Sequence, residues 1–311
     1  MTPAPPSAVV VLVPDQRGIE AFDGLPGIEP ILWDLSSPRP AGADRAQVLV
    51  SRGVAPEIAA QMHTELPNLR MVQLFSAGRD GWTGIVPAGV VISGADRAHG
   101  GPVAEWVVAQ LLNHYRDLVG YRAKQSAQSW ERHPTGTLAG KRVLVLGAGD
   151  IGSNVQQRTV PFGADVTLAA RTAREGVVDL VQARAMLHEQ DVVVLALPLT
   201  ADTQHMVDAP FLTAMRPGSV LVNAGRGPLV DTDALLAALE EQRIHAILDV
   251  TDPEPLPSGH PLWTAPGVVI TPHSAAITDD TVTRCWDAIV RNVSEFATST
   301  KSVGITMRGM P

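Results

Sequence analysis

The sequence predicts an α/β protein with two Rossmann-like, doubly wound domains, each built on a parallel sheet, and a cleft between the domains. Two observations carry this prediction. Short apolar runs alternate with helical stretches along the 311 residues, as in parallel sheets covered by helices. One apolar run is followed at once by glycines at the G-x-G-x-x-G spacing, Gly147, Gly149 and Gly152, as at the start of a dinucleotide-binding βαβ unit.

The composition is that of a soluble globular protein. The chain is 45% hydrophobic and 18% charged, and its net charge of −8 argues against non-specific nucleic-acid binding. A single cysteine, Cys285, excludes an internal disulfide and suits a reducing compartment. The apolar runs are too short to cross a membrane, and the first residues lack the positive charges of a secretory signal. We therefore expect a cytoplasmic protein that binds neither nucleic acid nor membrane.

The first hundred residues predict a small doubly wound unit. Apolar runs predict its strands, and Pro56 lies near the first turn of a short helix. Strands are expected at 9–13, 29–35, 46–50 and 69–75 and from 90 onward, and the helix at 56–65. Beyond Pro102, the amphipathic stretch 103–124 predicts one long helix that lies either between domains or against a second subunit.

The remainder of the chain predicts a complete Rossmann-type sheet and a final helix. Strands are expected at 143–146, 166–170, 192–197, 219–223, 246–249 and 268–270, and helices near 178–188, 209–215, 233–242 and 279–298. Because the last helix returns towards the first unit, two domains are predicted. They are a flavodoxin-like substrate domain, 1–98 plus 288–311, and a dinucleotide-binding Rossmann domain, 99–287.

Each glycine of the motif has a physical task. Gly147 permits a tight turn off the strand, Gly149 lets the backbone approach a pyrophosphate, and Gly152 lets the new helix pack close to the sheet. The helix begins within the motif, so its free N–H groups and positive dipole end face the anion. Asp150 and Ile151, between the glycines, are further expected cofactor-binding residues.

The end of the second strand of this unit departs from the pattern typical of NAD. An acid at this position bonds the ribose 2′-hydroxyl of NAD, whereas this chain has Ala170. The residues that follow are Arg171, Thr172 and Arg174. Two guanidinium groups and a hydroxyl, with no carboxylate before Glu175, suit a 2′-phosphate. We therefore expect NADP as the cofactor and NAD as a weaker one; the alternative is a solvated basic loop.

Polar residues follow three later strands, at the ends where ligands of such sheets bind. Arg226 stands between two glycines just past one strand, and Asp249 ends the next. Glu254 lies in the proline-rich loop after Asp249, and His273 comes just after the third strand. Three consecutive strands are thus expected to deliver an arginine, two acids and a histidine to one edge.

The motifs together resemble those of the D-isomer-specific 2-hydroxyacid dehydrogenase family over nearly the whole chain. Besides the glycine motif, the matching segments are LPLTADTQHMVD, NAGRG with LVD, DVTDPEPLP and HPLWTAPGVVITPHSA. VAEWVVAQLL fits the interdomain helix of the family, and FSAGRDG fits its substrate loop. The resemblance implies a homodimer paired through the nucleotide domain. It implies no metal, because the nicotinamide supplies the hydride chemistry.

The resemblance also assigns roles to the catalytic candidates. Arg226 orients the substrate carboxylate and polarises the neighbouring carbonyl. His273 is the acid in reduction and the base in oxidation, since the ordinary pKa of histidine, about 6.5, lies close to working pH. Glu254 bonds the other ring nitrogen and favours the protonated imidazole. Backbone N–H groups of Ala77 and Gly78 receive the substrate carboxylate.

The same resemblance extends the cofactor site and gives the expected reaction. Asp249 is similar to the family residue that bonds the nicotinamide carboxamide. The other implied cofactor-binding residues are Pro198, Thr203, Ala224, Gly225, Ser274 and Ala275. The expected function is NADP-dependent 2-keto acid reduction, on glyoxylate, hydroxypyruvate or a similar small acid. Two alternatives stay open: a dehydrogenase of another small anion such as phosphite, and a non-catalytic nucleotide-sensing regulator on the same scaffold.

Overall fold

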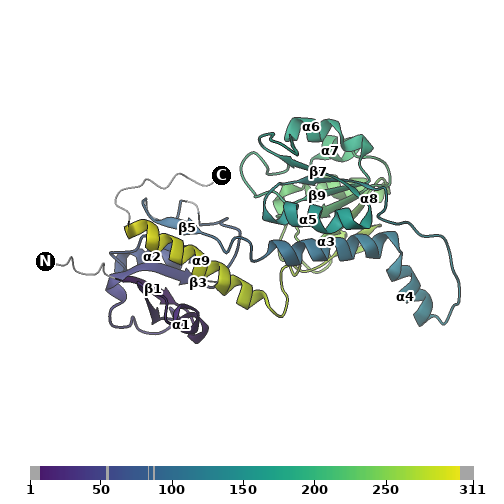
Figure 1. The fold of residues 1–311 in the computed structure, drawn as a ribbon. Helices are drawn as coiled ribbons and strands as arrows, with labels where there is room; N and C mark the ends of the chain where they lie inside the picture. The colour runs from purple at the N-terminus through teal and green to yellow at the C-terminus, as the bar shows by residue number, and fades with distance from the viewer. Residues whose placement is uncertain (1–7, 54–55, 83, 87, 302–311) are drawn as a thin grey trace. The chain divides into compact units, whose positions relative to one another are not determined.

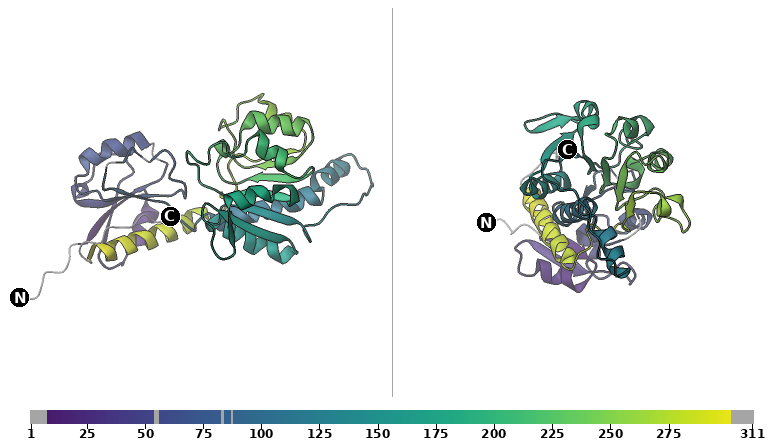
Figure 2. Two further views of the ribbon diagram at one scale, coloured as in Figure 1. Left: turned by 90° about the horizontal axis from the view of Figure 1, so that it is seen from above. Right: turned by 90° about the vertical axis from the view of Figure 1, so that its right-hand side faces the viewer.

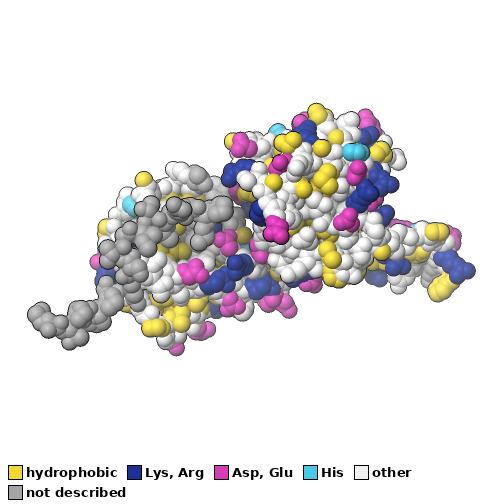
Figure 3. Space-filling view, turned by 45° about the horizontal axis from the view of Figure 1, so that its top comes forward, with side chains coloured by type: hydrophobic (Ala, Val, Ile, Leu, Met, Phe, Trp, Pro, Cys, Tyr) yellow, Lys and Arg dark blue, Asp and Glu magenta, His cyan; other side chains and the backbone are white. Residues whose placement is uncertain are grey.

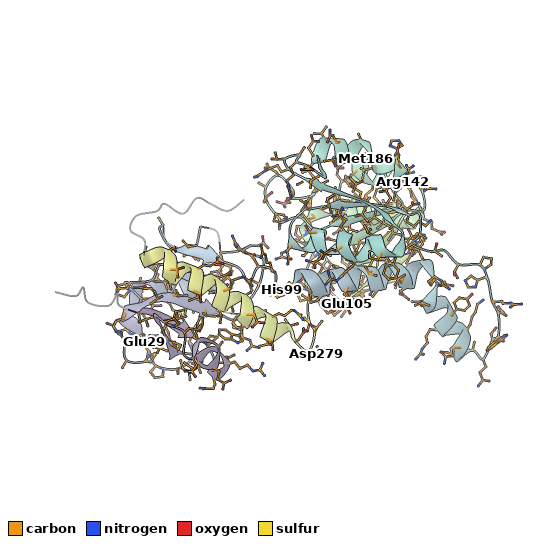
Figure 4. The ribbon with its side chains drawn as sticks, in the orientation of Figure 1. Glu29, His99, Glu105, Arg142, Met186 and Asp279 are labelled. Carbon is orange, nitrogen blue, oxygen red and sulfur yellow. The ribbon has the colours of Figure 1, made fainter. Side chains whose placement is uncertain are left out.

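The structure, a computed structural model, describes residues 8–53, 56–82, 84–86 and 88–301. The chain divides into two compact units, unit 1 (Met1–His99 and Asp279–Pro311) and unit 2 (Gly100–Thr278). Figure 4 labels His99 and Asp279, where the chain leaves unit 1 and where it returns. Residues 1–7 and 302–311 of the predicted substrate domain lie outside the described residues. The predicted fold class, α/β with two parallel sheets, is confirmed.

Unit 1 is a doubly wound parallel sheet, and its described strands run in the order β2-β1-β3-β4-β5. These strands are β1 (Val9–Val13), β2 (Ile28–Leu32), β3 (Ala46–Ser51), β4 (Met71–Leu74) and β5 (Val91–Ser93). The chain runs outward in opposite directions from β1 and from β3, so the strand order reverses between these two strands. Such a switch point leaves a crevice at the carboxyl ends of the strands.

Helices cover both faces of this sheet (Figures 1 and 2). Apolar side chains of α1 (Gln16–Phe22) and α9 (Thr281–Lys301) pack on one face, and the end of α2 (Pro56–Glu65) packs on the other. The short helix α1 escaped the sequence analysis because Gly18 interrupts it. A Cβ on Gly18 would lie 2.5 Å from a Val13 side-chain atom and 2.6 Å from one of Trp286, so only glycine lets α1 approach the sheet so closely.

Unit 2 has a larger parallel sheet, with the order β12-β11-β10-β9-β6-β7-β8 among the described residues. Its strands are β6 (Arg142–Leu146), β7 (Asp165–Ala170), β8 (Val177–Asp179), β9 (Val192–Leu195), β10 (Val220–Asn223), β11 (His245–Leu248) and β12 (Val268–Ile270). The order reverses between β6 and β9, as in a Rossmann fold. Helices α3 (Gly100–Tyr115) and α5 (Asp150–Thr159) cover one face, and α6 (Leu180–Ala185), α7 (Ala209–Ala214) and α8 (Thr232–Glu240) cover the other.

The predicted single helix at 103–124 is wrong, because two helices occupy this stretch. Helix α3 ends at Tyr115, and a second helix, α4 (Leu118–Ser126), follows it. Between them Asp117 has a left-handed backbone (φ 46°), and its side chain accepts the N–H of Gly120 and caps α4. Helix α4 buries none of its residues, and Figure 1 shows it extending from the body of unit 2.

Two further boundaries differ from the expectation. The stretch predicted as a helix from 178 begins instead as the edge strand β8, which pairs with the end of β7. The domain boundary expected at residue 288 falls inside α9, and the structure keeps this continuous helix with unit 1. Among the described residues, no helix is long and apolar enough to span a membrane.

Candidate active site

The glycine loop of unit 2 joins β6 to α5 at the point where the strand order reverses. A Cβ on Gly147 (φ 120°) would lie 2.3 Å from the carbonyl oxygen of Ala196, and one on Gly152 would lie 1.7 Å from that of Gly147. Packing within the protein therefore requires both glycines. By contrast, a Cβ on Gly149 would meet no atom within 4 Å. Gly149 is the N-cap of α5, so the open space lies where helix N–H groups and the helix dipole favour an anion. The loop thus fits a pyrophosphate.

Asp150 and Ile151 direct their side chains into the protein. The Asp150 carboxylate accepts the backbone N–H of Gly100 at 3.0 Å and the side-chain amide of Asn154 at 2.9 Å. It therefore ties the start of α3 to the start of α5. Ile151 packs against the apolar core beneath α3 and α5. Their backbone groups lie at the N-terminal turn of α5, beside the open space at Gly149.

The basic residues after β7 lie next to the glycine loop. The end of β7 pairs with the end of β6, with Ala169 opposite Leu146, so the two loops that follow are neighbours. Arg174 donates from Nη2 to the carbonyl oxygen of Ala148 at 3.0 Å, which holds its guanidinium against the loop. Arg171 and Thr172 are exposed directly after the strand. These positions suit an anionic group on an adenosine ribose.

The loops after β9 and β10 lie at the same carboxyl edge of the sheet as the loops after β6 and β7. Thr203 is buried, and its hydroxyl donates to the carbonyl oxygen of Pro198 at 2.8 Å. It closes the turn that follows β9. Ala224 and Gly225 come directly after β10, and a Cβ on Gly225 would lie 2.8 Å from the side chain of Leu229.

Arg226 is positioned by a buried asparagine that sequence reasoning missed. Asn223, 1% exposed, ends β10, donates from Nδ2 to the carbonyl oxygen of Arg226 at 2.9 Å and accepts the N–H of Gly225 at 3.1 Å. A Cβ on Gly227 would lie 1.8 Å from the carbonyl oxygen of Thr251, so the backbone runs tightly on both sides of the arginine. The sequence did indicate a special role for Asn223, because in NAGRG this polar side chain ends an apolar strand.

Asp249 organises the loop that carries His273. It is 4% exposed, and its Oδ1 accepts the Thr271 hydroxyl at 2.5 Å and the Ser274 N–H at 2.9 Å, while Oδ2 accepts the Ala275 N–H at 3.0 Å. A carboxylate offers about four acceptor positions. Donors from the described residues fill three of them, which leaves one for a ligand such as an amide. Thr271 was also missed, because a threonine after a strand carries no signal of its own.

The structure brings His273 and Glu254 together. Nδ1 of His273 lies 2.6 Å from Oε1 of Glu254, and both side chains are substantially exposed, at 50% and 41%. A carboxylate that accepts this hydrogen bond places a proton on Nδ1 and leaves Nε2 as the ring nitrogen available to a ligand. His273 has a left-handed backbone (φ 51°), and its N–H donates to the carbonyl oxygen of Asp249 at 2.7 Å. The ring is therefore held from both its side chain and its backbone.

The three polar groups of unit 2 share one sheet edge. Arg226 follows β10, Glu254 lies in the loop after β11, and His273 follows β12, and these strands are adjacent and parallel. The predicted substrate residues, Ala77 and Gly78, belong to unit 1, where they follow β4. Ser76 fixes that turn by donating from its hydroxyl to the carbonyl oxygen of Gly78 at 2.8 Å. The predicted site residues are thus divided between the two units. Within the described part of the chain, no group of three or more His, Cys, Asp or Glu is placed to hold a metal ion.

Comparisons with known proteins find similarity over most of the chain. Residues 108–275 match the family model "D-isomer specific 2-hydroxyacid dehydrogenase, NAD binding domain". A glyoxylate/hydroxypyruvate reductase B of Yersinia pestis is 31% identical over 297 residues, which cover 91% of this chain and 88% of the relative. A D-isomer specific 2-hydroxyacid dehydrogenase from Xanthobacter autotrophicus Py2, solved with NADPH and MES, has a TM-score of 0.80 at 26% identity, covering 98% of each chain. An NADPH-dependent glyoxylate/hydroxypyruvate reductase from Sinorhizobium meliloti, solved with NADP and sulfate, has a TM-score of 0.78 at 27% identity, covering 94% of this chain and 96% of the other.

Proposed function

The chain belongs to the D-isomer-specific 2-hydroxyacid dehydrogenase family, and we propose that it is an NADP-dependent reductase of small 2-keto acids such as glyoxylate or hydroxypyruvate. One observation carries the proposal. The hydrogen bond between Glu254 and His273 lies at the carboxyl edge of the same sheet whose glycine loop fits a dinucleotide. A nucleotide sensor has no need of this acid–histidine pair, whereas proton transfer to a carbonyl oxygen is a reaction that such a pair serves.

Each residue has a distinct part in the proposed reaction. A bound nicotinamide supplies the hydride chemistry. His273 delivers a proton from Nε2 to the substrate oxygen during reduction and removes it during oxidation, while Glu254 fixes the tautomer and stabilises the charged ring. Arg226 pairs with the substrate carboxylate and polarises the adjacent carbonyl. Backbone N–H groups of Ala77 and Gly78 contribute further donors to that carboxylate.

The preference for NADP over NAD is supported by two independent observations. Ala170 ends β7 where an acid would bond a free ribose hydroxyl, and Arg174 lies against the glycine loop. Similar structures from Xanthobacter autotrophicus and Sinorhizobium meliloti were solved with NADPH or NADP. We propose NAD as the weaker cofactor.

The reaction is tested directly by following NADPH consumption with a panel of 2-keto acids. Glyoxylate, hydroxypyruvate and pyruvate are the first substrates, and phosphite with NADP tests the competing dehydrogenase activity. Reduction of at least one acid supports the proposal. Activity on phosphite alone, or NADPH binding without any turnover, would replace it with the corresponding alternative.

Replacing Arg226 with alanine is expected to raise KM and lower kcat together. The guanidinium holds the carboxylate in both the ground state and the transition state, and a charge-assisted contact is worth about 10-fold or more in kcat/KM. Steady-state kinetics on the preferred acid measure both constants. Arg216→Ala is the matched control, since Arg216 is an exposed arginine paired with Asp191 before the amino end of β9. If only KM or only kcat changed, Arg226 would not hold the carboxylate in both the ground state and the transition state.

We further propose that the protein acts as a cytoplasmic homodimer. The apolar face of α3, which was expected to lie either between domains or against a second subunit, is buried in the core of unit 2. Support comes instead from α4 and the segment after it, where Leu118, Val119 and Trp130 are exposed, the last of them completely (101%). Figure 3 shows hydrophobic and basic side chains together at the end of this projection. Large exposed apolar groups of this kind mark association surfaces.

Trp130→Ser is therefore expected to weaken self-association by roughly 10-fold or more, since a buried interface tryptophan is a typical hot spot. Sedimentation over a range of concentrations measures the dissociation constant. Val181→Ser, at an 81% exposed position on α6, is the control for the loss of an exposed apolar side chain. A monomeric mass for the unmodified protein at micromolar concentration would refute the dimer.

A further inference from the structure

A polar side chain of α9, Asn292, lies against the ends of β4 and β5 in unit 1. Its Nδ2 is 2.9 Å from the carbonyl oxygen of Gly94 and 3.2 Å from Oε1 of Gln73. Oγ of Ser93, the last residue of β5, is 3.3 Å away, and Figure 1 shows α9 beside this strand. The oxygens of Gly94 and Gln73 can only accept hydrogen bonds, so the group that faces them is the NH2 of the amide. Asn292 is therefore a donor that joins α9 to the sheet.

The burial of Gln73 makes this donor costly to lose. Gln73 is completely buried in β4, and its Nε2 donates to the carbonyl oxygen of Leu74 at 2.9 Å. Its Oε1 is left to the amide of Asn292. A buried acceptor that loses its donor keeps the full cost of its desolvation. The contact thus fixes where α9 and the end of β4 meet.

Gly94 transmits this position to the loop that follows β4. A Cβ on Gly94 would lie 2.7 Å from the carbonyl oxygen of Ala77 and 3.1 Å from that of Ser76. The next residue, Ala95, donates its N–H to the carbonyl oxygen of Ser76 at 2.9 Å. The two backbone segments are in direct contact, so a displacement of Gly94 also displaces the peptide groups after Ser76 and Ala77.

These contacts determine where two backbone N–H groups point. In a trans peptide group the C=O and the N–H point in opposite directions. The carbonyl oxygens of Ser76 and Ala77 both lie against the segment that starts at Gly94, so the N–H groups of Ala77 and Gly78 point away from it. Ala77 is exposed, and within the described part of the chain neither N–H donates to another residue. Both are therefore available to a ligand.

A second tie between the same segments lies at the surface. Nη2 of Arg79 donates to Oδ2 of Asp96 at 2.9 Å, and Nη2 of Arg291 donates to the carbonyl oxygen of Asp96 at 3.0 Å. All three residues are exposed, and exposed ion pairs contribute little to stability. The partly buried contact of Asn292 is thus the stronger tie between α9 and this part of the sheet.

We propose that Asn292 is a positioning residue for substrate binding. Through Gly94 it holds the peptide groups of Ala77 and Gly78 so that their N–H groups meet the substrate carboxylate. The inference rests on the proposed function and adds to it a residue that acts through another. Because hydrogen bonds weaken steeply when donor and acceptor are misaligned, a small shift of these peptide groups lowers the affinity for the acid.

The test is Asn292→Leu, which removes the donor and keeps a side chain of similar size. The KM for the preferred 2-keto acid is expected to rise by roughly 10-fold or more, since the charge-assisted bonds of the loop are weakened. The kcat should stay within about 3-fold, because the lost binding is common to the ground state and the transition state. The KM for NADPH should not change. A residue needed only for folding would lower the amount of active enzyme, and hence the apparent kcat, at an unchanged KM for the acid; that result would overturn the inference.

Val293→Ala is the matched control for stability. Val293 is the next residue of α9, and its fully buried side chain belongs to the apolar core of unit 1. Its truncation leaves a cavity and should lower the melting temperature without changing the KM for the acid. A rise in KM as large as that of Asn292→Leu would mean that any loosening of α9 weakens substrate binding, and it would overturn the specific role of Asn292.

Gly94→Ala tests the same path from its other end. It keeps Asn292 but places a methyl group against the carbonyl oxygen of Ala77, so it should also raise the KM for the acid by roughly 10-fold. If both residues act through the loop, the double variant raises KM by less than the product of the two single effects. An unchanged KM in Gly94→Ala, or effects that multiply, would overturn the inference.

Oxalate binding separates the inference from the proposed function. Titration calorimetry of the NADP-loaded protein measures the affinity for this unreactive carboxylate, and Asn292→Leu should weaken it by roughly 10-fold. If the unmodified protein reduces no 2-keto acid, the proposed function fails, and a weaker affinity of Asn292→Leu for oxalate would still support the positioning role. Equal affinities, or no binding of oxalate to the unmodified protein, would overturn that role.

Discussion

His273→Asn is expected to lower kcat by on the order of 10²-fold or more, with the affinity for NADPH nearly unchanged. Asparagine keeps a hydrogen-bonding side chain at this position but exchanges no proton near neutral pH. Cofactor affinity should persist because the expected contacts with the pyrophosphate and the 2′-phosphate lie at the loops after β6 and β7, while the backbone of Ser274 and Ala275 stays bonded to Asp249. The loss therefore falls on the chemical step.

Single-turnover kinetics and NADPH fluorescence titration measure the two quantities separately. His188→Asn is a matched control, because Nε2 of His188 also lies near a glutamate, 3.7 Å from Oε1 of Glu189, but His188 precedes the amino end of β9. Turnover of His273→Asn close to that of the unmodified enzyme would remove His273 from the mechanism and assign its contact with Glu254 a structural role.

The sheets were predictable from the sequence because their central strands, such as β1, β9 and β10, are buried on both faces. Apolar runs such as 9–13, 143–146 and 192–195 carry no polar residue, and the structure forms strands over all three. Residues at strand ends followed from the same pattern, since a parallel sheet collects its carboxyl ends at one edge. The contact between Glu254 and His273 needed the family resemblance in addition, because nothing local in a proline-rich loop sets where a glutamate points.

Features decided by one or two residues were not predictable. The break between α3 and α4 depends on Asp117, which adopts a left-handed backbone and caps the next helix, although the apolar pattern continues past it. The short helix α1 depends on Gly18, which lowers helix propensity but allows close packing against Val13. The ion pair of Arg52 with Asp15 joins residues 37 positions apart, so it appears only once β1 and β3 pair.

The unmodified enzyme is expected to use NADPH in preference to NADH by on the order of 10²-fold or more in kcat/KM. Arg171, Thr172 and Arg174 follow β7, and the last of these lies 3.0 Å from the glycine loop through its contact with Ala148. Each charge-assisted contact to a 2′-phosphate is worth about 1.5–3 kcal/mol, so two of them account for the preference. Arg184→Ala is a suitable control, since Arg184 is an exposed arginine on α6 paired with Asp208.

Ala170→Asp combined with Arg171→Ala is expected to reverse this preference. Ala170 is the last residue of β7, and the end of that strand lies beside β6 and the glycine loop, so a carboxylate there meets the adenosine ribose. The new acid accepts a hydrogen bond from the free 2′-hydroxyl of NADH and repels the phosphate of NADPH, while the second change removes a cation that held the phosphate. Steady-state kinetics with both cofactors at a fixed, saturating 2-keto acid measure the reversal. Equal use of both cofactors by the unmodified enzyme would mean that the arginines serve only as solvated surface charges.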